Sequence, residues 1–109
     1  MIYGIRILAR AREDVQEIYD WIAERSPEGA QRWLDRFEEA TAALQTNPFL
    51  APLASESKSF AIEIRNTLFR TRSGRPYRAI FTVVGDEVRI LRVRGPGQPP
   101  IRVRDLPIE

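Results

Sequence analysis

The sequence predicts an α+β fold, in which an N-terminal strand and an antiparallel two-helix hairpin pack on an antiparallel sheet of about four strands. Apolar residues recur at helical spacing through two segments that only a few residues separate. Further along, strand-like alternation runs on both sides of a two-residue turn signal, Gly85-Asp86. The chain has 109 residues, 43% of them hydrophobic, which is the size and composition of one globular domain. We therefore expect residues 1–109 to form a single domain.

The first two elements are a strand and a helix. Residues 2–8 are rich in isoleucine and alternate loosely, which is typical of a strand. Over about residues 10–24, apolar side chains are spaced four, three and four residues apart, as in an amphipathic helix. This apolar stripe consists of Ala11, Val15, Ile18 and Ile22. The other side of the helix carries acidic residues and is expected to face solvent.

The second helix follows after a very short link, "RSPEG". Ser26 is typical of a helix N-cap, and Pro27 suits the first helical position. We expect this helix to span residues 27–46, because Asn47-Pro48 cannot continue its hydrogen-bond ladder. A link this short folds consecutive helices back on each other, so the two helices should form an antiparallel hairpin.

The second half of the chain reads as a three-stranded meander. Residues 49–59 predict a loop, and residues 60–71, "FAIEIRNTLFRT", predict the second strand. Alternation would place Ile64 on one side of that strand, and Glu63 and Arg65 on the other. The following "RSGR" has the composition of a turn, and strands three and four come after it. Four prolines near the end predict an extended C-terminal tail over residues 95–109.

The turn at Gly85-Asp86 fixes a register for strands three and four, because Val84 then faces Glu87. The face expected to pack on the helices contains Tyr77, Ala79, Phe81, Val83, Val88 and Ile90. The outward face is expected to contain Arg78, Ile80, Thr82, Arg89, Leu91 and Val93.

Two arginines fall elsewhere in the same register. Arg92 and Arg94 would lie at the far end of the core face, opposite Ala79 and Tyr77. Arg65 would share the outward face with Arg78 if strands two to four pair in order.

Positive charge is concentrated in the second half of the chain. Residues 1–57 hold six arginines against ten acidic residues, a net −4, whereas residues 58–109 hold one lysine and ten arginines against five acidic residues, a net +6. Sixteen of the seventeen basic residues are arginine, whose planar guanidinium binds carboxylate or phosphate through two hydrogen bonds. This asymmetry predicts an anionic partner for the second half.

The arginines of the meander have two interpretations. An uncovered sheet face with Arg65, Arg78 and Arg89, and with Arg70, Arg72 and Arg75 around the adjoining turn, would suit phosphate or carboxylate groups. Alternatively, these are ordinary solvated positions on strands and turns. For Arg78 we favour the first interpretation, since this residue lies in mid-hairpin between apolar residues.

The composition excludes several kinds of site. The chain has no cysteine and no histidine, so we expect no disulfide, no thiolate chemistry, no metal site and no cofactor. The side chain best suited to proton transfer near neutral pH is also missing. The first residues, "MIYGIRILAR", are too short and too charged an apolar run for a signal peptide or membrane span. We expect a cytoplasmic protein without a membrane partner.

Two stretches carry a resemblance to a known family. "AREDVQEIYDWIAE" is similar to a first helix with acidic residues around an apolar core, and "IRNTLFRTRSGRPYRAIFTVVGDEVRIL" to a meander whose third strand begins with a Tyr-Arg pair. Both features resemble the RelE/ParE superfamily of toxins from type II toxin–antitoxin systems. The resemblance implies a sheet curved around the helix hairpin and a growth-inhibiting toxin, also described as a plasmid stabilisation protein. It further implies a cognate antitoxin that binds and blocks the toxin in a hetero-oligomer.

The superfamily divides by mechanism. RelE-like members are ribosome-dependent RNases that cut mRNA, whereas ParE-like members inhibit DNA gyrase and cleave nothing. In the RNases, basic residues of the meander act together with basic and aromatic groups near the C-terminus. The segment "RGPGQPPIRVRDLPIE" offers no clear helix, Tyr or His there, and the helix hairpin is long. The chain therefore resembles the ParE branch more closely.

Each mechanism has its own candidate residues. A metal-independent endoribonuclease would use Arg78, Arg65 and Arg70, with arginine stabilising the phosphate. Arginine is a poor base because it stays protonated, and Glu63 is the base candidate on the outward face. An inhibitor of gyrase performs no chemistry, and exposed aromatic residues such as Trp21 then become candidates for the target interface.

The antitoxin, or a phosphate group, would pair with guanidinium groups of the meander. These candidates are Arg65, Arg70, Arg72, Arg78, Arg89, Arg92 and Arg94. A third hypothesis is a non-toxic relative that only binds a partner.

Overall fold

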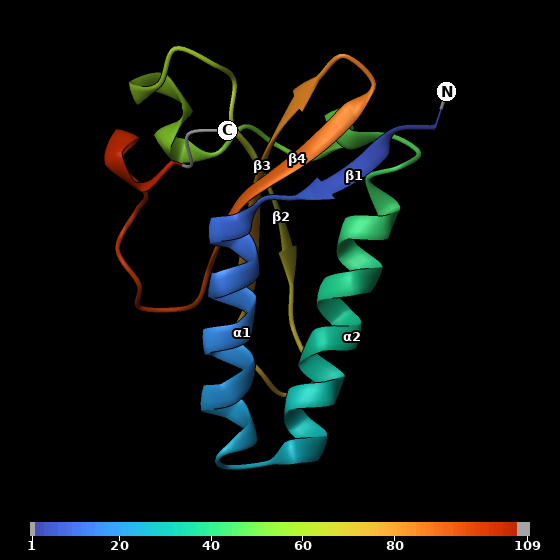
Figure 1. The fold of residues 1–109 in the computed structure, drawn as a ribbon, viewed down its shortest axis with the longest axis vertical. Helices are drawn as coiled ribbons and strands as arrows, with labels where there is room; N and C mark the ends of the chain where they lie inside the picture. The colour runs from blue at the N-terminus through green and yellow to red at the C-terminus, as the bar shows by residue number, and fades with distance from the viewer. Residues whose placement is uncertain (1, 107–109) are drawn as a thin grey trace.

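The computed structural model describes residues 2–106, and its elements follow the order that the sequence predicts (Figure 1). The elements are β1 (Gly4–Ile7), α1 (Ala9–Ala23), α2 (Pro27–Ala43), η1 (Pro48–Leu50), η2 (Ser55–Ser59), β2 (Arg65–Phe69), β3 (Tyr77–Val84), β4 (Glu87–Arg94) and η3 (Val103–Asp105), where η marks short 3-10 helices. The predicted α+β class is confirmed. Within residues 2–106, no helix is long and apolar enough to cross a membrane.

The helix hairpin forms where the local sequence places it. Ser26 caps α2 by accepting a hydrogen bond from the Gly29 backbone N–H at 2.9 Å, and Pro27 is the first helical residue. The helices α1 and α2 lie side by side and antiparallel in front of the sheet (Figure 1). Each predicted helix boundary lies within three residues of the observed one, and the largest difference is at the end of α2, which ends at Ala43 rather than Thr46.

The sheet has the order β1-β4-β3-β2, and it is mixed rather than wholly antiparallel. Strands β2, β3 and β4 form the predicted antiparallel meander, but β1 pairs with β4 in parallel. A hairpin turn forces its two strands to be antiparallel, whereas β1 reaches the sheet again only after two helices. A connection of that length permits parallel pairing. The expectation of an antiparallel first strand was wrong for this reason.

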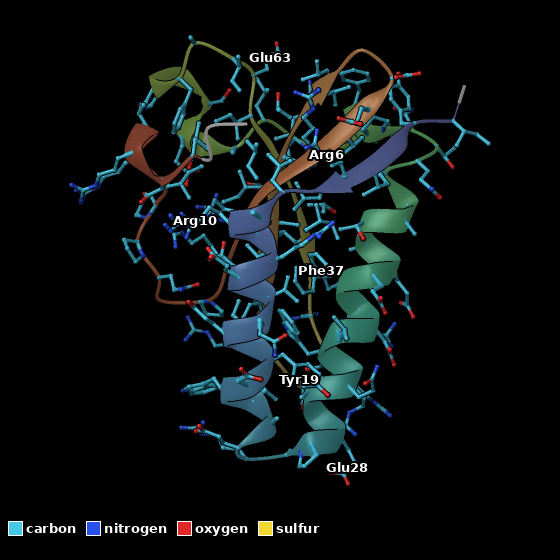
Figure 2. All side chains as sticks on the ribbon, viewed as in Figure 1. Arg6, Arg10, Tyr19, Glu28, Phe37 and Glu63 are labelled. Atoms are coloured by element: carbon cyan, nitrogen blue, oxygen red, sulfur yellow. The ribbon has the colours of Figure 1, made fainter. Side chains whose placement is uncertain are left out.

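The main core lies between the helices and one face of the sheet. Trp33 and Phe37 of α2 stack with ring centroids 6.2 Å apart, and Phe69 of β2 lies 5.6 Å from each of them. Figure 2 shows Phe37 and Tyr19 in the space between the two helices. The predicted core face is confirmed, because β3 and β4 contribute Ala79, Phe81, Val88 and Ile90, with Tyr77 and Val83 partly buried beside them.

A β-bulge in β4 changes the register beyond the middle of the hairpin. Phe81 pairs with Ile90, as predicted, but Ile80 pairs with Arg92, so Leu91 is the extra residue. Every later residue of β4 therefore changes face, and Val93 joins the main core. Arg92 and Arg94 consequently do not lie on the core face opposite Ala79 and Tyr77, and that prediction was wrong.

The opposite face of the sheet is covered rather than open. Ile80 of β3 packs there with Ala54 and Ile64 from the long loop and with Ile101 from the C-terminal segment, and all four are buried. Apolar side chains on both of these segments exclude water from the face that we expected to be uncovered. Within the segment 95–106 the chain makes a turn at residues 95–98 and the short helix η3. Residues 1 and 107–109, where our predictions of a single domain and of the tail extend, lie outside the described residues.

The second strand is shorter than residues 60–71. Ile64 bonds to the loop instead of the ladder, because its N–H donates to Ser57 Oγ at 2.9 Å and its carbonyl accepts from the Ala54 N–H at 2.7 Å. Arg65 opens β2 and pairs with Phe81, a core residue. Since opposed residues share a face, Arg65 lies on the helix side of the sheet and not on the side of Arg78. The prediction that they share a face was wrong.

One buried carboxylate joins α1 to the sheet. Asp14 accepts hydrogen bonds from Arg92 Nε at 2.7 Å, from Arg92 Nη2 at 3.0 Å and from the Val93 backbone N–H at 2.9 Å. Strand β1 pairs with β4 only as far as Ile90, so this part of the β4 edge has no neighbouring strand. The Asp14 side chain therefore takes the place of a missing ladder partner.

We expect the substitution Asp14→Leu to destabilise the fold by roughly 3–5 kcal/mol, because it leaves the buried Arg92 guanidinium without its counter-charge. The measurement is urea unfolding followed by tryptophan fluorescence. The double variant Asp14→Leu with Arg92→Met should lose less free energy of unfolding than Asp14→Leu alone. Arg10→Ala, which removes an exposed ion pair with Glu13, should cost less than about 1 kcal/mol. An unchanged free energy of unfolding in Asp14→Leu would contradict this account.

Candidate functional site

Arg78 is held by a carboxylate of the chain itself. Its guanidinium donates two hydrogen bonds to Glu56 of η2, of which Nη1 to Oε1 measures 2.9 Å, and a further one to Asn66 Oδ1 at 3.2 Å. Glu56 also accepts from the Ile101 backbone N–H at 3.2 Å. The hydrogen bonds from Arg78 lower the pKa of Glu56 from its ordinary 4.5 to about 2, although burial opposes the change. This clamp ties β3, the loop and the C-terminal segment together.

Arg92 and Arg94 are also engaged within the fold. Besides its bonds to Asp14, Arg92 donates from Nη1 to the Asp105 carbonyl at 2.8 Å. The bonds to Asp14 raise the pKa of Arg92 above its ordinary value, against the effect of burial. Arg94 Nη2 lies 3.5 Å from the Asp105 carboxylate. Both arginines therefore anchor the C-terminal segment to β4.

Arg65 and Arg89 have partners as well. Arg65 Nη1 donates to the Ala51 carbonyl at 2.7 Å, and its guanidinium lies 5.3 Å from the centre of the Phe49 ring. Arg89 donates from Nε to Glu87 at 2.6 Å. Of the meander arginines that we proposed for binding phosphate or carboxylate groups, Arg70, Arg72 and Arg75 are exposed and have no polar partner among residues 2–106.

The structure does not assemble the residues of an endoribonuclease. Arg65 lies on the other face of the sheet from Arg78, and Glu63 is exposed and 3.5 Å from Arg65. Tyr77 points toward the core, as predicted, and stacks near Phe69 with a centroid distance of 5.9 Å. Desolvation raises the pKa of its hydroxyl above the ordinary value, which makes it a weaker acid. Within residues 2–106 no cluster of three or more side chains is suited to a metal ion.

A large hollow lies between the helix hairpin and the β2–β3 turn. This cleft has a volume of about 710 Å³, and four arginines line it. Arg32 and Arg36 come from α2, and Arg72 and Arg75 from the turn. Arg36 pairs with Glu39 at 2.9 Å, whereas the other three have no polar partner within the described part of the chain. The sequence could have indicated the helical pair, because a spacing of four residues puts Arg32 and Arg36 on one side of α2.

Trp21 stands at the mouth of this cleft. Its side chain is 55% exposed, although it is one of the largest apolar groups of the chain. The Arg25 guanidinium lies 3.8 Å above the indole ring, and its Nη1 donates to the Trp21 carbonyl at 2.7 Å. A second hollow of about 310 Å³ opens on the other side of Trp21, toward Gly95 and Gln98. Trp21, our candidate for the target interface, therefore lines both hollows.

The clamp between Glu56 and Arg78 predicts a pH dependence of stability. Because the pKa of Glu56 in the folded protein lies below its ordinary value, its contribution is present above about pH 4.5 and is lost as the pH falls toward 2. This difference between the ordinary and the folded-state pKa of Glu56 corresponds to about 3 kcal/mol in the free energy of unfolding. Over this interval wild type should therefore lose more stability than the variant Glu56→Gln. Chemical unfolding at a series of pH values tests this, and parallel curves for the two proteins would contradict it.

The comparisons with known proteins agree with this fold. No curated protein matches the sequence. A solved structure described as the chromosomal ParDE toxin–antitoxin system from P. aeruginosa has a similar fold, with a TM-score of 0.65 and 24% sequence identity. The match covers 85% of this chain and 95% of that one.

The family comparison covers nearly the whole chain. A model of the ParE toxin of type II toxin–antitoxin systems, parDE, matches residues 5–98, which include every element from α1 to β4 and all of β1 except Gly4. The matched residues include the helix hairpin and the meander that carry the predicted resemblance. The chain belongs to the ParE toxin family of type II toxin–antitoxin systems.

Proposed function

We propose that this chain is a toxin that acts in the cytoplasm by inhibiting DNA gyrase and that a cognate antitoxin neutralises it by forming a complex with it. Membership of the ParE family and the fold shared with a ParDE system support a type II toxin. In this proposal the chain binds a protein target and makes or breaks no covalent bond itself.

The main support for this proposal is that Arg78 and Arg65 are already bonded within the fold. An endoribonuclease needs guanidinium groups that are free to meet a phosphate in one place. Arg78 is held by the buried Glu56, and Arg65 bonds to the loop from the other face of the sheet. An RNA phosphate at Arg78 would have to compete with that carboxylate for the two Nη groups. This arrangement supports a protein-binding inhibitor over an mRNA endonuclease.

Trp21 supplies the second support. Tryptophan and arginine are enriched among the residues that dominate protein interfaces. Tryptophan buries a large area at a low cost in conformational entropy, because its side chain has only two rotatable bonds. Trp21 is more than half exposed, and the contact with Arg25 restricts the orientations of its ring. A protein target that covers this ring would gain affinity without ordering a flexible side chain.

Inducible expression in bacteria tests the function directly. The proposal expects growth to stop, purified protein to inhibit supercoiling by gyrase, and mRNA to stay intact. Cuts in translated mRNA without inhibition of gyrase would instead identify a RelE-like RNase. A folded protein that leaves growth unaffected would identify a non-toxic relative that only binds a partner.

We expect Trp21→Ala to weaken inhibition of gyrase by about tenfold or more, as for the central aromatic residue of an interface. Leu50→Ala is the matched control, because Leu50 is 81% exposed and lies outside both hollows. It should inhibit like wild type. Equal inhibition by the Trp21 variant and wild type would remove Trp21 from the target interface.

Arg70→Ala gives a separate test of the nuclease alternative. Arg70 is exposed and has no polar partner in the described structure, so its loss should leave the fold intact. A gyrase inhibitor should keep its effect on growth in this variant. A nuclease that uses Arg70 on RNA should lose most of that effect, and a growth assay at matched protein levels separates the two results.

A further inference from the structure

The two hollows on either side of Trp21 form one groove. The larger cleft and the smaller hollow share Trp21, Tyr77 and Pro96 as lining residues. The groove therefore runs from α2 and the β2–β3 turn, past Trp21, to the start of the C-terminal segment. Along α2 alone it extends from Gly29 to Glu39, about 15 Å at the helical rise. That length matches about four or five residues of extended peptide.

We infer that this groove docks an acidic peptide segment of a protein partner, with an apolar side chain of the segment seated against Trp21 and Tyr77. The inference deepens the proposed function and rests on it, because the proposed function identifies the protein that carries the segment. It names the surface and the chemistry of that contact.

The positive charge of the groove favours an acidic peptide segment as its ligand. Of the four arginines in the groove, only Arg36 has a carboxylate partner in the part of the chain that the structure describes, namely Glu39. The carboxylate of Asp35 accepts from the Gln31 side-chain amide at 2.9 Å rather than from a guanidinium. Arg32, Arg72 and Arg75 are thus exposed and have no partner among residues 2–106. Such guanidinium groups bind carboxylates through paired hydrogen bonds.

The centre of the groove selects an apolar side chain. Trp21 forms one wall, and Tyr77 and Pro96 form the rest of the passage between the two hollows. Trp33, which is fully buried, lies below with its ring centroid 5.5 Å from that of Tyr77. The floor is therefore rigid and aromatic, which suits a leucine or phenylalanine side chain.

The mixed charge along the groove favours a peptide over a nucleic acid. Glu17 lines the end near Gly95, and Asp35 and Glu39 line the end near the arginines. A nucleic acid carries a phosphate on every nucleotide, so some phosphates would lie beside these carboxylates. A peptide can place its acidic residues only where the guanidinium groups are.

The fold holds the groove in this shape at two points. Asp14, which is bonded to β4, shares one face of α1 with Glu17, Ile18 and Trp21, at helical spacings of three, four and seven residues. This contact therefore turns Trp21 toward the groove. At the other wall a Cβ on Gly95 would lie 2.7 Å from Tyr77 Cε2, so only glycine lets the chain pass this close to the ring. A larger residue at position 95 must displace Tyr77.

Peptide titration of the purified full chain tests the inference. The probe is a fluorescein-labelled peptide of twelve residues with a central Leu-Phe pair, glutamate on one side of this pair and serine on the other. One control peptide carries lysine in place of glutamate, and another lacks the apolar pair. Anisotropy gives the Kd, and tryptophan emission should shift to shorter wavelength as Trp21 is covered. We expect each control peptide to bind at least about tenfold more weakly than the probe.

Variants locate the contact. Arg72→Glu with Arg75→Glu should weaken binding of the probe at least about tenfold, and Gly95→Val should also weaken it by moving Tyr77. Arg12→Glu with Arg104→Glu is the control of equal charge, because both arginines are exposed and lie outside the groove. Circular dichroism checks that each variant is folded. If Gly95→Val does not fold, the double variant of the β2–β3 turn still decides the result.

Three outcomes overturn the inference: equal binding of the lysine peptide, an unchanged Kd in the Arg72 and Arg75 variant, or tighter binding of a twelve-nucleotide single-stranded RNA with the same dependence on these arginines. Growth inhibition is measured separately on the same variants. Toxicity without binding of the acidic peptide would reject the groove and leave the proposed function standing. Binding of the acidic peptide without toxicity would reject the proposed function and leave the groove standing.

Discussion

The Asp14 carboxylate is the contact on which the arrangement of helices and sheet depends. It bonds to the Val93 backbone and to Arg92 at a part of the β4 edge that β1 does not reach. A buried guanidinium without this partner would carry a large desolvation penalty, so α1 must lie at this edge and in this rotation. Trp21, two helical turns further along the same face, is thereby directed toward Tyr77 and the groove. A contact within the core thus determines which aromatic side chain is exposed.

Arginine has two separate uses in this chain. Arg78, Arg92 and Arg94 hold the loop and the C-terminal segment against the sheet, each with a carboxylate of the chain as counter-charge. Arg32, Arg72 and Arg75 have no such partner within the described residues and remain exposed. Only arginines of the second kind can bind a partner without breaking the fold. Part of the positive charge in the second half of the chain is therefore neutralised within the fold and is not available for binding a partner.

Local patterns predicted much of the fold, and non-local contacts explain the differences. The N-cap Ser26, the turn at Gly85-Asp86 and the spacing of apolar residues in the helices depend on near neighbours, and each was correct. The bulge at Leu91 was not predictable, since it lets Val93 join the core and Arg92 meet a residue 78 positions away. Residues 60–64 alternate like a strand, but Ile64 bonds to the preceding loop. Of the residues that line the candidate site, Trp21, Arg72 and Arg75 were named as candidates from the sequence, whereas Arg32 and Arg36 were not.

The sequence by itself determined the family, the helix hairpin and the antiparallel meander, because each depends on periodicity, on caps or on a tight turn within a few residues. The tertiary structure alone decided which arginines are free. A guanidinium group looks the same in the sequence whether a distant Glu56 or Asp14 lies beside it or water does. That difference arises only when the loop and the helix are packed on the sheet, and it moves the candidate binding surface from the sheet face to the groove beside Trp21.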